Sequence, residues 1–187
     1  KILKDTYPST PIMALTATAT PQVLNDISEQ LALKNPSIFK ASFNRPNLYY
    51  QIRPKKNTVK ELISFIQARP QESGIIYCQS RKRVDEISEK LCAQGFSAQP
   101  YHAGLSAEQR NTNQHNFIYD KTTIIVATVA FGMGINKPDV RYVVHLDLPK
   151  SIEQYYQETG RAGRDSLPSH CLLFFSMADK HKYTRFI

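Results

Sequence analysis

The sequence lacks the features that mark a membrane-spanning or secreted protein. No apolar run approaches the roughly 18 residues that cross a bilayer, and the opening KILKDTYPST lacks the long apolar core of a signal peptide. The three cysteines are odd in number and widely spaced, which favours neither a disulfide framework nor a zinc site. We therefore expect Cys78, Cys92 and Cys171 to be reduced core residues of a soluble intracellular protein without bound zinc or another metal.

Acidic residues are scarce relative to basic ones. Sixteen Asp and Glu residues stand against twenty-four Lys and Arg residues, which gives a net charge of +8. This excess favours an anionic partner, and nucleic acid is the leading candidate. The alternative is that the charge serves only solubility. With 187 residues, the chain is long enough for one complete domain and part of a second.

Apolar runs alternate with helical patterns through most of the chain. Short apolar stretches predict strands at SGIIYC, FSAQPYH, TTIIVAT, VRYVVHLDL and SHCLLFFS. Helices are predicted after the N-caps Ser80, Ser106 and Ser151, and the last two each precede by three residues a glutamine that would complete a capping box. Continuous apolar strands alternating with helices indicate an α/β fold, in which a parallel sheet is covered by helices on both faces.

The beginning of the chain has a different pattern. TPIMALTATAT predicts one strand, and Thr20 with Pro21 begins one helix. One strand and one helix are too little to fold alone. In the stretch that follows, LYYQIR predicts a strand that leads into the basic turn PKKN, and this region is predicted to link two bodies. The boundary is expected near Asn44 to Asn47, between residues 1–45 and residues 46–187.

Ligands of an open α/β sheet bind beyond the carboxyl ends of the strands. Four such ends carry the sequences CQSRKR, YHAG, ATVAFGMG and DLPKS. Ser80 and Arg81, at a helix N-terminus, would suit a phosphate, but an ordinary N-cap beside solvated charges explains them equally well. His102 follows a strand, where a lone histidine is more often a structural residue, and a glycine such as Gly132 only permits close approach of a ligand.

The stretch QETGRAGR places two glycines beside two arginines. If a helix continued through it, Gln157, Arg161 and Arg164 would line one face, and the glycines would let that face approach another surface closely. Arginine suits the stabilisation of a transferring phosphoryl group, because its guanidinium is always charged and binds oxygens through parallel hydrogen bonds. The alternative, surface pairing of the arginines with Glu158 and Asp165, would not require the glycines.

Five motifs, in this order, closely resemble the later motifs of the RecQ family of ATP-dependent DNA helicases: LTATAT, IIYCQSRKRV, YHAGLSAEQR, IIVATVAFGMGINKPDVRYVVH and YYQETGRAGRD. The resemblance implies a P-loop NTPase-type helicase core. Residues 1–45 would be the end of the first RecA-like domain with the linker, and residues 46–187 the second RecA-like domain. Two alternatives are a DEAD-box-type RNA helicase, which usually has histidine in place of Gln157, and a non-catalytic nucleic-acid-binding module.

The resemblance also implies roles for individual residues. Arg164 matches the arginine finger that reaches the γ-phosphate of ATP, with Arg161 and Gln157 beside it in a catalytic network. The positions that match nucleotide binding and coupling are Gly132, Gly134, Asn136, Thr16 and Thr18. The positions that match residues facing the DNA strand are Ser80, Arg81, His102, Gly104 and Thr128. The family usually has glycine in place of Ser166, and this departure weakens the expectation of a left-handed backbone there.

No phosphate loop of the form G-x-x-x-x-G-K-[ST] and no acidic magnesium box occur in the sequence. We therefore expect an upstream RecA-like domain of the same protein to hold most of the ATP and Mg²⁺, and this chain alone to lack ATPase activity. The resemblance implies a 3′–5′ DNA helicase that acts in DNA repair and recombination, in the bacterial cytoplasm or a eukaryotic nucleus. Its partners would be single-stranded DNA and duplex junctions, contacted mostly at phosphates, and no membrane.

Overall fold

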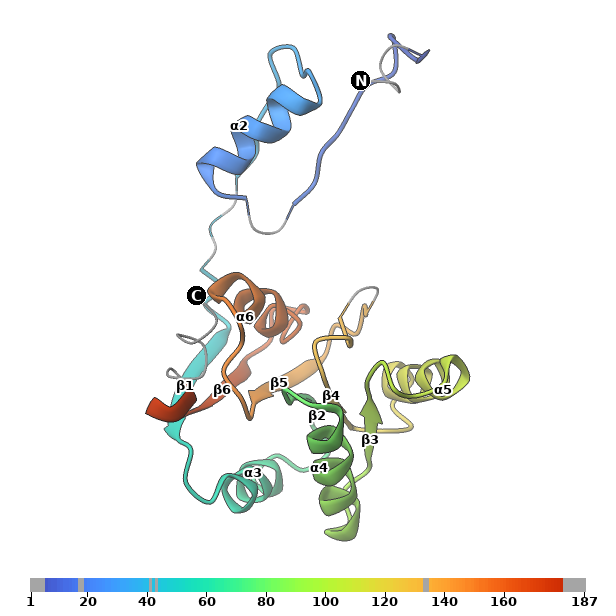
Figure 1. The fold of residues 1–187 in the computed structure, drawn as a ribbon, viewed down its shortest axis with the longest axis vertical. Helices are drawn as coiled ribbons and strands as arrows, with labels where there is room; N and C mark the ends of the chain where they lie inside the picture. Colours follow the sequence, from blue (N-terminus) through green and yellow to red (C-terminus); the bar gives the residue numbers. More distant parts are fainter. Residues whose placement is uncertain (1–5, 17–18, 41, 43, 133–134, 180–187) are drawn as a thin grey trace. The chain divides into compact units, whose positions relative to one another are not determined.

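The computed structural model describes residues 6–16, 19–40, 42, 44–132 and 135–179. The chain divides into two compact units, residues 1–45 and residues 46–187. Figure 1 shows the helices and strands of both units. Among the described residues, no helix has the length and apolarity needed to cross a membrane.

The first unit contains helix α2 (Pro21–Gln30), which begins as predicted. The side chain of Thr20 accepts a hydrogen bond from the N–H of Val23 at 3.3 Å, and Pro21 is the first helical residue. The predicted strand before it is wrong, because residues 11–16 form no strand. Met13 and Leu15 are 80% and 87% exposed. A strand needs a neighbour for its backbone hydrogen bonds, and the described residues of this unit provide none.

The second unit is built on a six-stranded parallel sheet with the order β1-β6-β5-β2-β4-β3. Its strands are β1 (Leu48–Pro54), β2 (Ser73–Tyr77), β3 (Ala98–Tyr101), β4 (Ile124–Ala127), β5 (Val140–His145) and β6 (Ser169–Phe175). The inner strands β2 and β4 are buried at every position, which explains their continuous apolar sequences. The strand predicted at LYYQIR is confirmed as β1, but it is not part of a linker, because β1 pairs with β6 along its whole length.

The helices that accompany the sheet include α3 (Thr58–Gln67), α4 (Arg81–Ala93), α5 (Ala107–Ile118) and α6 (Ile152–Thr159). Helix α3 is an addition to the predicted elements. Ser80, Ser106 and Ser151 are confirmed as N-caps, since each accepts a hydrogen bond from the N–H three residues later. Ser106 forms a full capping box, whereas Gln154 accepts instead from the N–H of Lys150 at 3.4 Å.

Each face of the sheet has its own hydrophobic core. Phe65 of α3 and Ile87 of α4 pack on one face, together with Ile76 of β2. Phe117 of α5 packs on the other face with Ile75, the preceding residue of β2. Successive residues of β2 therefore supply both cores, as expected of a strand covered on both sides. The predicted parallel α/β sheet is confirmed.

Two of the three cysteines belong to these cores. Cys78 and Cys171 are buried, whereas Cys92 is exposed near the end of α4. The prediction of a core position is therefore wrong for Cys92, whose Sγ donates to the carbonyl of Ala98 at 3.2 Å. In the described ranges, no group of three His, Cys, Asp or Glu side chains could hold a metal ion.

One of the two edge strands of the sheet, β3, contains a proline, Pro100. The carbonyl of Pro100 accepts a hydrogen bond from Nδ2 of Asn113 in α5 at 2.8 Å. The next carbonyl, of Tyr101, accepts from the N–H of Thr128 after β4 at 3.1 Å. Because successive backbone groups of a strand point to opposite sides, the backbone groups of Pro100 face the outer edge of the sheet.

Candidate functional site

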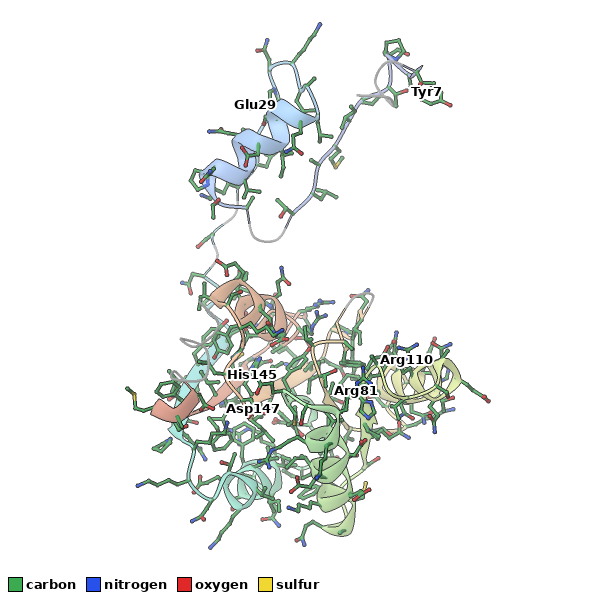
Figure 2. The ribbon with its side chains drawn as sticks, viewed as in Figure 1. Tyr7, Glu29, Arg81, Arg110, His145 and Asp147 are labelled. Carbon is green, nitrogen blue, oxygen red and sulfur yellow. The ribbon has the colours of Figure 1, made fainter. Side chains whose placement is uncertain are left out.

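Four candidate residues of the second unit lie at the carboxyl edge of the sheet. Ser80 and Arg81 follow β2, His102 follows β3, and Thr128 follows β4. These three strands are neighbours in the sheet and are parallel, so their loops meet at one edge. Figure 2 labels Arg81 at the beginning of α4, and His145 at the end of β5.

His102 is a buried residue that holds its own loop. Its Nδ1 accepts a hydrogen bond from the N–H of Gly104 at 3.1 Å, and its Nε2 lies 2.8 Å from Oδ1 of Asp85. In a neutral ring, Nε2 then carries the proton and donates to Asp85. The side chain of His102 is only 6% exposed. These contacts fit a histidine that positions the backbone of Gly104.

Arg81, Ser80 and Thr128 are more accessible. A Cβ added to Gly104 would lie 3.2 Å from Cδ of Arg81, so the arginine side chain passes close to the glycine backbone. Ser80 and Arg81 are exposed at the N-terminus of α4, and Thr128 is partly buried. An exposed helix N-terminus, a cation and a hydroxyl on one edge form a surface that suits phosphate groups.

The two arginines of the GRAGR segment lie in a turn, which corrects the expectation of a continuous helix. Helix α6 ends at Thr159, and residues 160–165 form turns. Gly163 has a φ of +53°. A Cβ at this position would lie 2.5 Å from Nδ2 of Asn47 and 2.7 Å from Oγ of Ser169. Gly163 therefore serves a left-handed backbone and close packing within the second unit, rather than the approach of a helix to another surface.

Asn47 and Ser166 complete this arginine turn, residues 160–166. Nδ2 of Asn47 donates to the carbonyls of Gly163 at 2.9 Å and Leu167 at 3.0 Å, so the start of β1 fixes the turn. Ser166 has a φ of +67°. The left-handed conformation is therefore present although the residue is not glycine, contrary to the weakened expectation.

Both arginines bind the coupling loop, residues 128–139. Nη1 of Arg161 donates to the carbonyl of Gly132, and Nη1 of Arg164 donates to the carbonyl of Ile135 at 2.6 Å. Nε of Arg161 is buried and has no hydrogen-bond partner among the described residues. The structure thus brings the predicted catalytic arginines together with the predicted coupling residue Gly132.

The acidic residues beside the arginines bind other partners. Oδ2 of Asp165 lies 2.5 Å from Nη2 of Arg141, and this hydrogen bond lowers the pKa of the Asp165 carboxyl. Oε2 of Glu158 lies 2.7 Å from Nε2 of His145. These contacts disfavour the alternative in which the arginines serve only to pair with Glu158 and Asp165.

Of the remaining candidates, three are exposed and two lie outside the described residues. Gln157 is exposed on α6, and Asn136 is exposed on the coupling loop. Thr16 is exposed in the first unit. Thr18 and Gly134 lie outside the described residues.

A buried polar pair, His145 and Glu158, was not predicted. His145 and Glu158 are 1% and 4% exposed, and Nε2 of Gln154 donates to Oε1 of Glu158 at 2.9 Å. The pair joins the end of β5 to α6. The only sequence signal is a histidine at the end of an apolar strand, and it does not identify a partner thirteen residues later.

Tyr77 connects this pair to the coupling loop. Its ring stacks on His145 with the centroids 5.2 Å apart, and its hydroxyl donates to the carbonyl of Phe131 at 2.9 Å. Burial raises the pKa of Tyr77 far above its usual value, although the nearby Arg161 guanidinium opposes this effect. The hydroxyl therefore remains a hydrogen-bond donor at all physiological pH values.

A buried lysine holds the other end of the coupling loop. Nζ of Lys137 lies 2.6 Å from Oδ1 of Asp120 and 3.1 Å from Oδ1 of Asp139, and its side chain is only 2% exposed. Asp120 follows α5, so the ion pair ties the loop to that helix. The lysine is buried, whereas the carboxylates of Asp120 and Asp139 are exposed. The loop is therefore anchored both at Lys137 and at the arginine turn.

Comparisons with known proteins agree with the motifs in the sequence. Residues 54–166 match the family described as helicase conserved C-terminal domain. The ATP-dependent DNA helicase RecQ of Pasteurella multocida is 51% identical over 177 residues, which cover 95% of this chain and 28% of that protein. The RecQ-like DNA helicase BLM of Xenopus laevis is 50% identical over 190 residues, which cover 100% of this chain and 14% of that protein. The chain therefore spans less than a third of these relatives.

Two solved structures share the fold. S. cerevisiae Dbp5 bound to RNA and ADP BeF3 superposes with a TM-score of 0.72 at 19% identity, over 91% of this chain and 46% of that one. The RNA-helicase Prp28 from Chaetomium thermophilum bound to ADP gives 0.65 at 23% identity, over 91% and 42%. These likenesses confirm the RecA-like fold alone. The sequence matches show that the chain belongs to the helicase conserved C-terminal domain family, as the corresponding region of the RecQ family.

Proposed function

We propose that this chain supplies the second half of an ATP-driven DNA helicase motor. Residues 46–187 would be the second RecA-like domain, and residues 1–45 the end of the first. The observation that carries the proposal is the docking of Arg161 and Arg164 on the coupling loop, whose Thr128 lies on the same sheet edge as Ser80 and Arg81. A displacement of the arginines would thus reach the surface that suits phosphates.

The arginine turn fits a nucleotide phosphate. Nε of Arg161 is a buried donor without an acceptor in the part of the chain that the structure describes, and guanidinium groups bind phosphate oxygens through charge-assisted hydrogen bonds. Arg164 would contact the γ-phosphate of ATP, with Arg161 and Gln157 beside it. ATP, bound with Mg²⁺, would supply the terminal phosphoanhydride bond whose hydrolysis drives the motor. Most of their ligands would come from the upstream RecA-like domain.

The DNA strand would cross the loops after β2, β3 and β4. Ser80, Arg81 and Thr128 would contact phosphates directly, and His102 would hold the backbone of Gly104 in place for a further contact. Contacts of this kind are tolerant of sequence and depend steeply on salt. The 3′–5′ direction, roles in DNA repair and recombination, and a location in the bacterial cytoplasm or a eukaryotic nucleus belong to the same proposal.

Replacing Arg81 with alanine in the full-length protein is expected to weaken single-stranded DNA binding and its salt dependence. Loss of one phosphate contact should reduce the slope of log K against log salt by about 0.7. The measurement is fluorescence anisotropy across a salt series. Lys121→Ala is the control, because it removes a positive charge beside the amino end of β4, on the opposite edge. Equal slopes for the two variants would remove Arg81 from the DNA site.

The proposed function is tested by ATP hydrolysis of the full-length protein with and without single-stranded DNA. We expect stimulation by DNA, and displacement of a strand from a duplex with a 3′ tail. The 187-residue chain alone is expected to be inactive. Stimulation by RNA in place of DNA would favour an RNA helicase, and DNA binding without any hydrolysis would favour a non-catalytic binding module.

A further inference from the structure

The hydroxyl of Tyr77 contacts the same loop as the arginine turn. It donates to the carbonyl of Phe131 at 2.9 Å. The next carbonyl in the chain, that of Gly132, accepts the hydrogen bond of Arg161. Two successive carbonyls of the coupling loop are therefore hydrogen-bonded, the first by the Tyr77 hydroxyl of β2 and the second by the Arg161 guanidinium of the arginine turn.

The position of this hydroxyl is itself fixed. Tyr77 ends β2, a strand buried at every position, and its side chain is 4% exposed. Its ring stacks on His145 at an interplanar angle of 23°, and His145 is bonded to Glu158 of α6. A group on a central strand with a locked ring provides a more precise reference point than a group on a loop.

Electrostatic interactions connect the same groups. Burial is the largest influence on the pKa of Tyr77 and raises it. The positive charge of Arg161 lowers this pKa, and the negative charge of Glu158 raises it. Arg164 also lowers it. The Tyr77 hydroxyl therefore lies close enough to both arginines and to Glu158, in the last turn of α6, to interact with their charges.

We propose that Tyr77 is a positioning residue for ATP hydrolysis, which sets the place of Arg161 and Arg164 through the carbonyls of the coupling loop. The inference rests on the proposed function. Tyr77 does not contact the nucleotide in this account. It fixes Phe131, whose neighbour Gly132 receives Arg161, and the loop continues to Ile135, which receives Arg164. Small misplacements of catalytic groups reduce turnover strongly.

The chain offers a matched control in Tyr142. This residue is also fully buried on a strand of the same sheet, but its hydroxyl has no hydrogen-bond partner among the described residues. It lies near the amino edge of the sheet, in a cavity lined by Arg69 and Glu72. Tyr77→Phe and Tyr142→Phe thus remove the same atom from two equally buried rings, and only the first removes a contact to the coupling loop.

The test is DNA-stimulated ATP hydrolysis by the full-length protein. We expect Tyr77→Phe to lower kcat by about tenfold to a hundredfold, with the KM for ATP and the Kd for DNA unchanged within about twofold, and Tyr142→Phe to match the wild type. In an Arg161→Ala background, Tyr77→Phe should cause a smaller loss than in the wild type, because part of the arrangement that Tyr77 supports is already absent. Multiplying losses, or a kcat for Tyr77→Phe equal to that for Tyr142→Phe, would overturn the inference.

Hydrogen exchange gives a second readout that does not depend on activity. The amides of the coupling loop and the arginine turn should exchange faster in Tyr77→Phe than in Tyr142→Phe, and equal rates would also overturn the inference. The two proposals fail differently. A wild-type protein that never hydrolyses ATP defeats the proposed function and this inference with it. Hydrolysis that Arg164→Ala abolishes but Tyr77→Phe leaves intact defeats the inference alone.

Discussion

Replacing Arg164 with alanine in the full-length protein is expected to lower DNA-stimulated ATP hydrolysis by about 10³-fold or more. An arginine that contacts the γ-phosphate neutralises charge that develops as the phosphoryl group is transferred. The measurement is steady-state kcat at saturating ATP and DNA. DNA affinity, measured in parallel, should change little, because the proposed phosphate contacts to DNA come from other loops.

Two further variants separate the chemistry of Arg164 from its contact with the coupling loop. Arg164→Lys keeps the charge and one donor toward the carbonyl of Ile135, but it loses the forked hydrogen-bond geometry, so hydrolysis should remain strongly impaired. Arg53→Ala removes an arginine that pairs with Glu61 on the surface and should leave hydrolysis near the wild-type value. Normal hydrolysis with a large loss of DNA binding in Arg164→Ala would reverse the assignment.

Replacing Gly163 with alanine is expected to destabilise the second unit by about 2–5 kcal/mol. The left-handed backbone costs a non-glycine residue about 1–2 kcal/mol, and overpacking typically costs about 1–3 kcal/mol. The overpacking arises because the new Cβ would meet Asn47 and Ser169, and also the carbonyl of Leu167 at 2.8 Å. The backbone of Leu167 cannot swing away as a long side chain would. The measurement is urea unfolding of the 187-residue chain, followed by circular dichroism.

Gly95 provides the control for Gly163. It has a φ of +83°, but a Cβ there would meet nothing within 4 Å. Gly95→Ala should therefore show only the backbone cost, about 1–2 kcal/mol. The difference between the two variants measures the close packing around the arginine turn. Equal losses of stability would mean that the turn adjusts to a side chain, and that the packing at Gly163 is dispensable.

Much of the second unit follows from short-range sequence patterns. The apolar runs of β2 and β4 identify strands because both faces of these strands are buried. Ser80 and Ser106 identify helix starts because a serine hydroxyl replaces a missing backbone partner. The same reasoning failed for residues 11–16, where an apolar sequence has no strand to pair with among the described residues of its unit. For LYYQIR it identified the strand but not its place in the sheet, because the pairing of β1 with β6 joins residues more than a hundred positions apart.

The site was less predictable, because its contacts are long-range. The residue types of the GRAGR segment indicated phosphate chemistry, but periodicity suggested a helix where Gly163 instead takes a left-handed conformation. Tyr77, His145 and Lys137 were missed, since each is an isolated residue whose partner lies in another element. Such partners become visible only when the sheet order places the strand ends together.

The proline in the edge strand β3 is expected to oppose aggregation of the protein at high concentration. An exposed edge strand can pair with a strand of another molecule and begin aggregation, because its outward N–H and C=O groups are unpaired. At the outer edge of β3, Pro100 offers no N–H, and its carbonyl is already bonded to Asn113. A strand from a second molecule would find neither a donor nor a free acceptor there. Pro100 and Asn113 together would therefore protect this edge from intermolecular sheet growth, without covering it with another element.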